Sequence, residues 1–231
     1  MRKFISMVAR DVRELLYPVI CLVCGDRLRD ETHLCSFCLD HAFEPANSEG
    51  NDACEGLIMP EWIRMQDSLW EFDKGGFLQD VLHQVKYSGL AALGVTLGRQ
   101  LGYKLRRNRW LTADMKTVLL PVPLHPARKR KRGYNQSAKI AEGVADVTGS
   151  VIADEKAVIR VKKTRTQTGL SARVRRANID SAFRLQHKEL FRDEPVIIID
   201  DVITTGATTL ELAGLVRKHT DVIGIATIAR A

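Results

Sequence analysis

The stretch that decides the fold reads Val196-Ile197-Ile198-Ile199-Asp200-Asp201-Val202-Ile203-Thr204-Thr205-Gly206-Ala207-Thr208. Four branched apolar residues lead into two adjacent carboxylates and then into a small, hydroxyl-rich turn. A continuous run of valine and isoleucine is typical of a strand that is buried on both faces, as in a parallel sheet. The run therefore predicts an α/β fold with this strand inside the sheet.

The turn Thr204–Thr208 separates this strand from a predicted helix over 207–219, which has apolar residues at helical spacing. Free backbone N–H groups and the helix dipole favour an anion such as phosphate at this place. Gly206 lets the backbone approach the anion closely. Ala207 begins the helix, and three hydroxyls add hydrogen-bond donors, those of Thr204, Thr205 and Thr208.

Two carboxylates, Asp200 and Asp201, stand directly before this turn. They would repel a phosphate, and side by side at the end of a strand they suit sugar hydroxyls or a Mg²⁺ ion. Turn and acids together favour a phosphorylated ribose as the ligand. The alternative is a parallel strand with an N-cap turn and two solvated acids.

The same string resembles the phosphoribosyl-pyrophosphate (PRPP) signature of type I phosphoribosyltransferases, without a gap. The resemblance implies that Asp200 and Asp201 contact the ribose 2′- and 3′-hydroxyls. It also implies that the turn Thr204–Thr208 holds the 5′-phosphate.

The bulk properties are those of an ordinary soluble globular protein. The 231 residues are 45% hydrophobic and 27% charged, and no apolar run approaches the ~20 residues that span a bilayer. Charged residues interrupt the first twenty residues, which argues against a signal peptide and favours a short amphipathic helix. We expect a cytoplasmic protein.

The net charge of +7 is concentrated in two basic runs. Five basic residues fill Arg128–Arg132, and seven more lie within 160–176 without an acidic residue. Such clusters indicate a surface for polyanions, either nucleic acid or pyrophosphate. Either run taken alone would by default be a solvated charged loop, but this alternative weakens when a phosphate site lies nearby in the fold.

Four of the five cysteines form two pairs, Cys21-x-x-Cys24 and Cys35-x-x-Cys38, separated by ten residues. Two such pairs predict a structural zinc site with four thiolate ligands and no open coordination position. A disulfide framework is the alternative, and a reducing compartment disfavours it. His33 and His41 are substitute ligands in principle, and Cys54 is expected to be an unligated thiol.

The rest of the chain alternates predicted helices and strands, which indicates a parallel sheet with its ligand site at the carboxyl ends of the strands. Helices are expected over 75–89, 93–105 and 135–147, and strands over 119–124, 158–161 and 222–228. We expect a helix and a four-cysteine zinc module over 1–42, a connector or hood with little regular structure over 43–70, and the main domain over 71–231.

A wider set of motifs resembles the ComF/GntX family of competence-associated, phosphoribosyltransferase-like proteins. The motifs are Leu15–Gly25, Lys86-Tyr87-x-Gly89, Pro121–Leu124, Arg132–Gln136, Lys163–Leu170, Arg176-x-Asn178, Ala182-Phe183 and the PRPP string. The resemblance covers nearly the whole chain. It implies a zinc ribbon on a type I phosphoribosyltransferase fold and a link to DNA uptake or DNA use.

The leading interpretation is an enzyme that binds Mg²⁺–PRPP and transfers phosphoribose to an unidentified acceptor. Candidate groups for the pyrophosphate are Lys86, the loop residues Pro123, Leu124 and His125, and the cations Arg128, Arg132, Lys163 and Arg165. The segment that contains Lys163 and Arg165 resembles the flexible loop that closes over PRPP in the family. Lys86 is equally consistent with a cation that stabilises the end of a helix.

Two alternatives have no transferase chemistry. A protein with a PRPP pocket would bind single-stranded DNA through its basic runs, although an aromatic content of 6% offers few stacking platforms. A scaffold would dock a competence helicase or another competence protein through residues 1–16.

Overall fold

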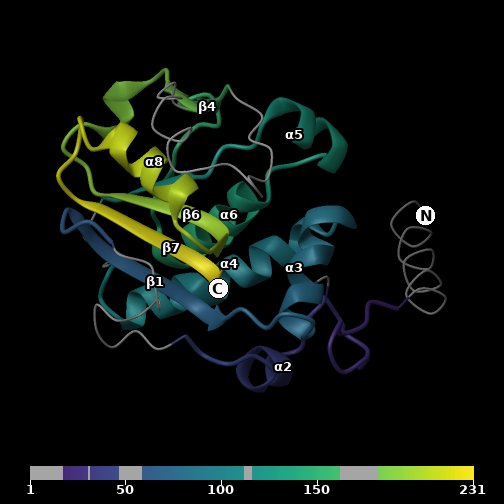
Figure 1. Cartoon of the computed structure of the whole chain (residues 1–231). Helices are drawn as coiled ribbons and strands as arrows, with labels where there is room; N and C mark the ends of the chain where they lie inside the picture. The colour runs from purple at the N-terminus through teal and green to yellow at the C-terminus, as the bar shows by residue number, and fades with distance from the viewer. Residues whose placement is uncertain (1–17, 31, 47–58, 112–115, 162–181) are drawn as a thin grey trace, which may run out of the picture.

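The computed structural model describes residues 18–30, 32–46, 59–111, 116–161 and 182–231. Five parallel strands form the main sheet in the order β1-β7-β6-β2-β3 (Figure 1). Their bounds are Ile63–Glu71 for β1, Ile223–Arg230 for β7, Val196–Ile203 for β6, Val118–Pro121 for β2 and Val151–Ile152 for β3. The predicted parallel α/β sheet is confirmed.

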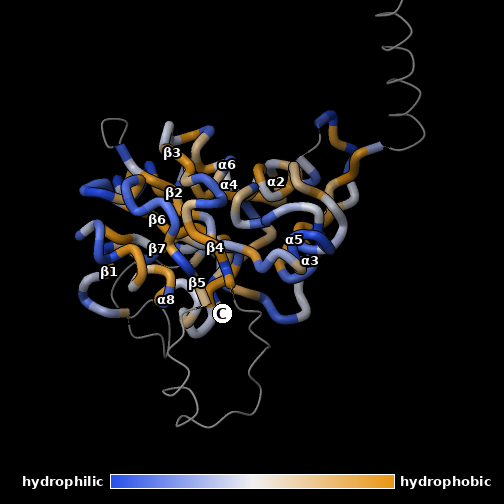
Figure 2. Tube along the Cα trace, turned by 90° about the horizontal axis from the view of Figure 1, so that it is seen from above, coloured by the Kyte–Doolittle hydropathy of each residue, from blue (hydrophilic) through white to orange (hydrophobic). Residues whose placement is uncertain are grey.

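The strand β6 lies at the centre of the sheet, and its alternate residues point to opposite faces. Ile197 and Ile199 belong to a hydrophobic cluster with helices on one face, and Val196 and Ile198 belong to a second cluster on the other face. Figure 2 shows the hydrophobic colour on the central strands. Burial on both faces explains why this strand has no polar alternation.

In the described part of the chain, four longer helices cover the sheet, three of them on one face. The helices α3 (Phe77–Tyr87), α4 (Ala91–Arg107) and α6 (Gln136–Thr148) belong to the first cluster, and α8 (Ala207–Val216) belongs to the second. Each matches a helix expected from the apolar periodicity, with ends shifted by at most three residues. Among the described residues, no helix is long and apolar enough to cross a membrane.

The sequence missed most of strand β1, which begins at Ile63 inside the stretch expected to be irregular. Two polar residues of this strand, Asp67 and Ser68, are buried because they have partners. The Asp67 carboxylate accepts a hydrogen bond from Asn108 Nδ2 at 2.8 Å and pairs with Lys104 Nζ at 3.0 Å. The hydroxyl of Ser68 lies 2.7 Å from that of Thr227. Partners this distant in sequence cannot be read from local periodicity.

Two further expectations need correction. The predicted strand near 158–161 does not join the main sheet: β4 (Val158–Arg160) pairs antiparallel with β5 (Phe183–Leu185). The solvated loop that was the alternative interpretation of the basic run 128–132 is also wrong, because this run forms most of helix α5 (Pro126–Arg132). Proline at the first helical turn and the His125 ring, which accepts a hydrogen bond from the Ala127 N–H at 3.2 Å, explain the helix start.

Helices α4 and α6 cross closely because glycines replace side chains at the contact. A methyl group on Gly98 would overlap with the carbonyl oxygen of Ile140, and one on Gly143 would overlap with the carbonyl oxygen of Val95. These helices place the residues at the start of α6 against the sheet, so their separation bears on the site described below.

We expect Gly98→Ala to lower the free energy of unfolding by about 1–3 kcal/mol, because the added methyl group must push two backbones apart. Gly214→Ala in α8 is the matched control, since a methyl group there would meet nothing within 4 Å. Alanine should stabilise α8 at that position by up to ~1 kcal/mol. Urea unfolding measures both, and equal values for the two variants would contradict the close crossing.

Candidate functional site

The carboxyl ends of β6 and β2 meet at one edge of the sheet. Pro121, the last residue of β2, pairs with Ile199, so the loop after β2 begins beside Asp200. A pocket of about 330 Å³ opens at this edge. It is lined by Lys86, Tyr87, Val122, Leu124, Arg128, Arg132, Gln136, Arg160, Asp200, Asp201 and Thr208. Two carboxylates and four cations therefore share one small cavity.

Asp200 is partly exposed in this pocket, and the Ser137 side chain holds its carboxylate. Its Oδ1 accepts hydrogen bonds from the Ser137 hydroxyl at 2.8 Å and from the Asp201 backbone N–H at 2.9 Å. Burial, followed by the negative charge of Asp201, raises the pKa of the Asp200 carboxyl well above its usual range. The ionised form of Asp200 is therefore less favourable than that of an ordinary aspartate.

Asp201 is buried, and its Oδ2 lies 2.5 Å from Lys86 Nζ. Burial acts to raise the pKa of Asp201, but the Lys86 ammonium, together with a hydrogen bond to Asp200 and the charge of Arg132, lowers it. Lys86 is the penultimate residue of α3, where a cation stabilises the end of the helix. It also forms an ion pair with Asp201. Two adjacent acids therefore have opposite electrostatic environments.

The turn Thr204–Thr208 forms a second, smaller cavity of about 70 Å³ beside the pocket, and Asp200 and Thr208 line both. Gly206 has a φ of 66°, the left-handed conformation that glycine adopts without strain. Thr204 and Thr205 are exposed, and α8 begins directly after Gly206 at Ala207. The turn therefore presents hydroxyls and the start of a helix to one cavity.

The loop after β2 contributes less to the pocket than the sequence indicates. Leu124 lines it, whereas Pro123 and His125 line a neighbouring cavity of about 850 Å³. The His125 ring caps helix α5. The structure thus brings Lys86, Leu124, Arg128, Arg132 and Thr208 to the two acids and places Pro123 and His125 beside them.

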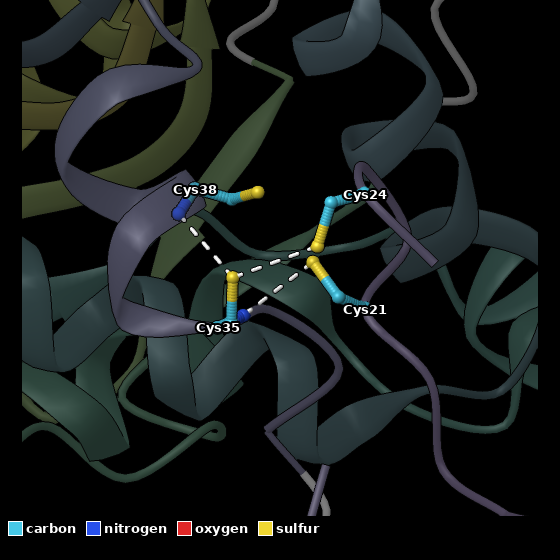
Figure 3. A group of neighbouring side chains, drawn as sticks. All are labelled: Cys21, Cys24, Cys35 and Cys38. Carbon is cyan, nitrogen blue, oxygen red and sulfur yellow. Dashed lines mark hydrogen bonds between the residues drawn. The ribbon is translucent and has the colours of Figure 1, made fainter. Parts of the chain in front are cut away.

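The four-cysteine cluster, made of Cys21, Cys24, Cys35 and Cys38, lies apart from this pocket, between the turn at 21–24 and the start of helix α2 (Ser36–His41). Figure 3 shows the four side chains directed toward a common centre. Their sulfur atoms lie within 4.8 Å of one another, and those of Cys24 and Cys35 are 3.8 Å apart. A disulfide would need ~2.05 Å, and all four cysteines are free thiols.

This geometry suits a zinc ion. A tetrahedron with Zn–S distances of ~2.3 Å has sulfur–sulfur edges of about 3.8 Å. Burial raises the pKa of the Cys21 thiol, but backbone N–H groups, first that of Cys24, outweigh it and lower the pKa to about 6. The backbone N–H of Cys38 donates to Cys35 Sγ at 3.4 Å. Burial, followed by the neighbouring thiols of Cys35, Cys24 and Cys21, raises the pKa of Cys38, so a bound cation is needed to hold all four sulfur atoms as the thiolates that metal binding requires.

The four-cysteine cluster is continuous with the rest of the core. Cys21, Cys38 and Phe43 belong to the same hydrophobic cluster as helices α3 and α4. The rings of Phe43 and Trp70 of β1 have centroids 4.7 Å apart. The cysteine cluster therefore stabilises one edge of the sheet as well as its own loops.

No family model matches the chain, but several known proteins are similar to it over most of their length. DNA utilization protein YhgH of Salmonella typhimurium is 31% identical over 210 residues, which cover 90% of this chain and 87% of that protein. The protein of the same name in Escherichia coli K12 is 31% identical over 206 residues, covering 87% and 85%. Competence protein F of Haemophilus influenzae is 36% identical over 147 residues, covering 61% and 62%.

The chain belongs to the ComF family. The family that the sequence motifs indicate is thereby confirmed. The relatives are named for DNA utilization and for competence, and these names concern those proteins.

The structure of this ComF-family chain adds site residues that the sequence did not reveal. Ser137 holds Asp200, and Gln136 accepts a hydrogen bond from Arg132. The Asn135 side chain caps α6 and donates to the carbonyl of Val122 at 3.0 Å. The motif Arg132–Gln136 already pointed to this segment in the sequence. The roles of its residues became visible only in the structure, where the motif forms the junction of α5 and α6.

Arg160 is a further residue of the pocket in this ComF-family protein. It was singled out only as the first residue of a basic run. Its guanidinium lies over the Phe183 ring, 5.3 Å from the centroid. Burial and then the charge of Arg128 lower the pKa of Arg160. Arg128 and Arg160 line the same cavity, and two cations in one cavity favour an anion between them.

Several sequence predictions fall outside the described part of the chain. Lys163 and Arg165, the rest of the basic run to Arg176, Cys54 and the N-terminal helix are among them. The described ends of that run are anchored near the pocket. The Val161 N–H donates to the Ala182 carbonyl at 2.8 Å, and the Ala182 N–H donates to the Glu211 carboxylate.

Proposed function

We propose that this ComF-family protein binds Mg²⁺–PRPP on a type I phosphoribosyltransferase fold and transfers the phosphoribosyl group to an acceptor. One observation carries the proposal: two adjacent carboxylates at the end of β6 share a pocket with four cations and adjoin the anion-receptive turn at Gly206. A sugar that carries phosphates at both ends needs this order of charges.

The turn at Thr204–Thr208 would hold the 5′-phosphate, because the start of α8 and the exposed hydroxyls supply donors. Asp200 and Asp201 would face the ribose hydroxyls. Lys86 neutralises Asp201 at 2.5 Å, whereas the pKa of Asp200 is raised. A second carboxylate without sufficient countercharge fits a divalent cation, so Asp200 is the residue expected to hold Mg²⁺ together with the ligand oxygens.

In the transfer, a lone pair of the acceptor forms the new bond to C1 of the ribose. The bond from C1 to pyrophosphate breaks, and its electron pair leaves with the pyrophosphate. Arg128, Arg132 and Arg160 would stabilise the negative charge that develops on this leaving group. Asp200 would hold Mg²⁺, which would supply further positive charge to the leaving group.

A second candidate function is supported by the names of the relatives and by helix α5. Arg128, Arg130 and Lys131 are exposed on this short helix, and such a row of cations suits the backbone of single-stranded DNA. A DNA-binding protein of this kind would use the PRPP pocket for regulation. Alternatively, the protein would be a scaffold that binds a competence partner. Both functions would draw on Arg128.

Calorimetry with Mg²⁺–PRPP, combined with fluorescence anisotropy of a labelled oligonucleotide, separates the two. We expect saturable PRPP binding and displacement of the oligonucleotide by PRPP, since both ligands need the pocket cations. Heat-free titrations would contradict the PRPP proposal. If PRPP fails to displace DNA while Arg128→Ala lowers the log–log salt slope of DNA binding by roughly 0.7 per lost contact, the DNA function is favoured.

For the four-cysteine cluster we propose structural zinc, because four thiols at tetrahedral spacing leave no coordination position for a substrate.

A further inference from the structure

Tyr87 lines the pocket, but most of its side chain is exposed to solvent. It is the last residue of α3, and 60% of its surface is accessible to solvent. Its neighbour Lys86 binds Asp201, but the proposed function gives Tyr87 no role. A contact with a neighbouring residue would explain why an exposed aromatic side chain lies at the mouth of a charged pocket.

That contact is with Arg132. The Arg132 guanidinium carbon lies 5.3 Å from the centroid of the Tyr87 ring, within the range of a cation–π interaction. Arg132 is the last residue of α5, so two helix ends face each other across the mouth of the pocket. On its other side, Arg132 Nη1 donates to Gln136 Oε1. The guanidinium is therefore held by a ring and by an amide.

The ring of Tyr87 is itself supported. His83, one helical turn earlier, packs against it with ring centroids 4.6 Å apart and an interplanar angle of 40°. The Tyr134 hydroxyl donates to the carbonyl of Val85, which ties the end of α3 to the α5–α6 junction. The aromatic pair of His83 and Tyr87 thus forms a shelf at a fixed position relative to Arg132.

The charge of Arg132 acts on the acids of the pocket. Arg132 lines the cavity with Asp201, and its positive charge contributes, after Lys86, to lowering the pKa of that carboxyl. A long and flexible arginine side chain could reach many places from this helix end. Its planar group is effective toward an anion only when its direction is set before the ligand arrives.

We propose that Tyr87 is a positioning residue, which with His83 and Gln136 directs the Arg132 guanidinium toward the pyrophosphate of a ligand in the pocket. This inference rests on the proposed function for its ligand, but the contact itself does not. Tyr87 would act through the face of its ring, so its hydroxyl is dispensable.

The test uses two measurements on the full chain. The first is the NMR resonance of the Arg132 Nε–H group, which the ring current of Tyr87 shifts without any ligand. The shift should be lost in Tyr87→Leu and retained in Tyr87→Phe. The second is the affinity for Mg²⁺–PRPP and for inorganic pyrophosphate, which Tyr87→Leu should weaken about two- to fivefold, the size of an exposed cation–π contact.

Tyr103→Leu is the matched control, because Tyr103 is 57% exposed on α4 and does not line the pocket. It should leave both measurements unchanged. In an Arg132→Gln background, Tyr87→Leu should cause no further loss of affinity, which a merely structural role would not produce.

Three outcomes would overturn the inference, and they are distinguishable. If the Arg132 resonance is the same in wild type and Tyr87→Leu, the contact between Arg132 and Tyr87 is contradicted. If wild type and Tyr87→Leu bind PRPP with equal affinity, the positioning role is contradicted while the proposed function stands. If wild type binds neither PRPP nor pyrophosphate, the proposed function fails and the positioning role fails with it, although the resonance still reports the contact.

Discussion

Asp200→Asn is expected to stabilise the protein at neutral pH, whereas Asp201→Asn is expected to destabilise it, although the two residues are neighbours. Burial and the charge of Asp201 make ionised Asp200 unfavourable, and asparagine can still accept the Ser137 hydrogen bond. Asp201→Asn leaves the Lys86 ammonium without its partner. The second change should cost about 3 kcal/mol, the lower end for a buried pair, because the Lys86 side chain is 27% exposed.

The pH dependence should also have opposite signs. Asp200 has a raised pKa in the folded state, so its contribution to stability is present at acid pH and is lost as the pH rises through that pKa. Asp201 has a lowered pKa, so its contribution is present above the ordinary aspartate pKa and is lost as the pH falls. Each difference from wild type should therefore be largest at neutral pH and shrink in acid.

Thermal unfolding from pH 2 to pH 8 measures these effects, and a loss of ~3 kcal/mol corresponds to roughly 6–12 °C for a chain of this size. Asp221→Asn is the control, since Asp221 is an exposed acid away from the pocket. Changes of the same sign in both variants would contradict the charge distribution described above.

Both variants should also weaken Mg²⁺–PRPP binding if the proposed function is correct. A stabilised Asp200→Asn protein that no longer binds PRPP would identify Asp200 as a residue retained for its ligand at a cost in stability. Calorimetry on the stabilised variant excludes unfolding as the cause. Unchanged affinity in the double variant would remove the sugar and Mg²⁺ assignment.

Cys24→Ser is expected to release zinc and to lower the melting temperature by about 10 °C or more, because a structural zinc site supplies ~10–16 kcal/mol of apparent binding free energy. The cluster shares its hydrophobic contacts with Trp70 of β1 and with α4. Loss of the metal should therefore loosen the β1 edge of the sheet and leave β6 and β2 protected.

Hydrogen exchange resolves this gradient, and elemental analysis counts the metal. Cys54→Ser is the control, since Cys54 stands outside the two Cys-x-x-Cys pairs. Exchange confined to residues 18–46 would show that the module is independent of the sheet. Purified wild type without zinc would contradict the metal site itself.

Local signals in the sequence were sufficient for the central strand, the acids beside the turn, the four clustered cysteines and four helices. Each depends on residues close together in the chain: the apolar run into Asp200, the spacing of Cys21 and Cys24, the periodicity of α3. Such patterns report the burial or ligand geometry of one short segment, and a few residues carry that information.

The tertiary structure alone decided which groups meet. Lys86 on α3 pairs with Asp201 of β6, Ser137 at the start of α6 holds Asp200, and Arg160 of β4 enters the pocket. The same holds for strand β1, whose buried Asp67 is balanced by Lys104. A charge is stabilised by what lies within a few ångströms of it, and the sheet brings those groups together from segments that are far apart in the chain.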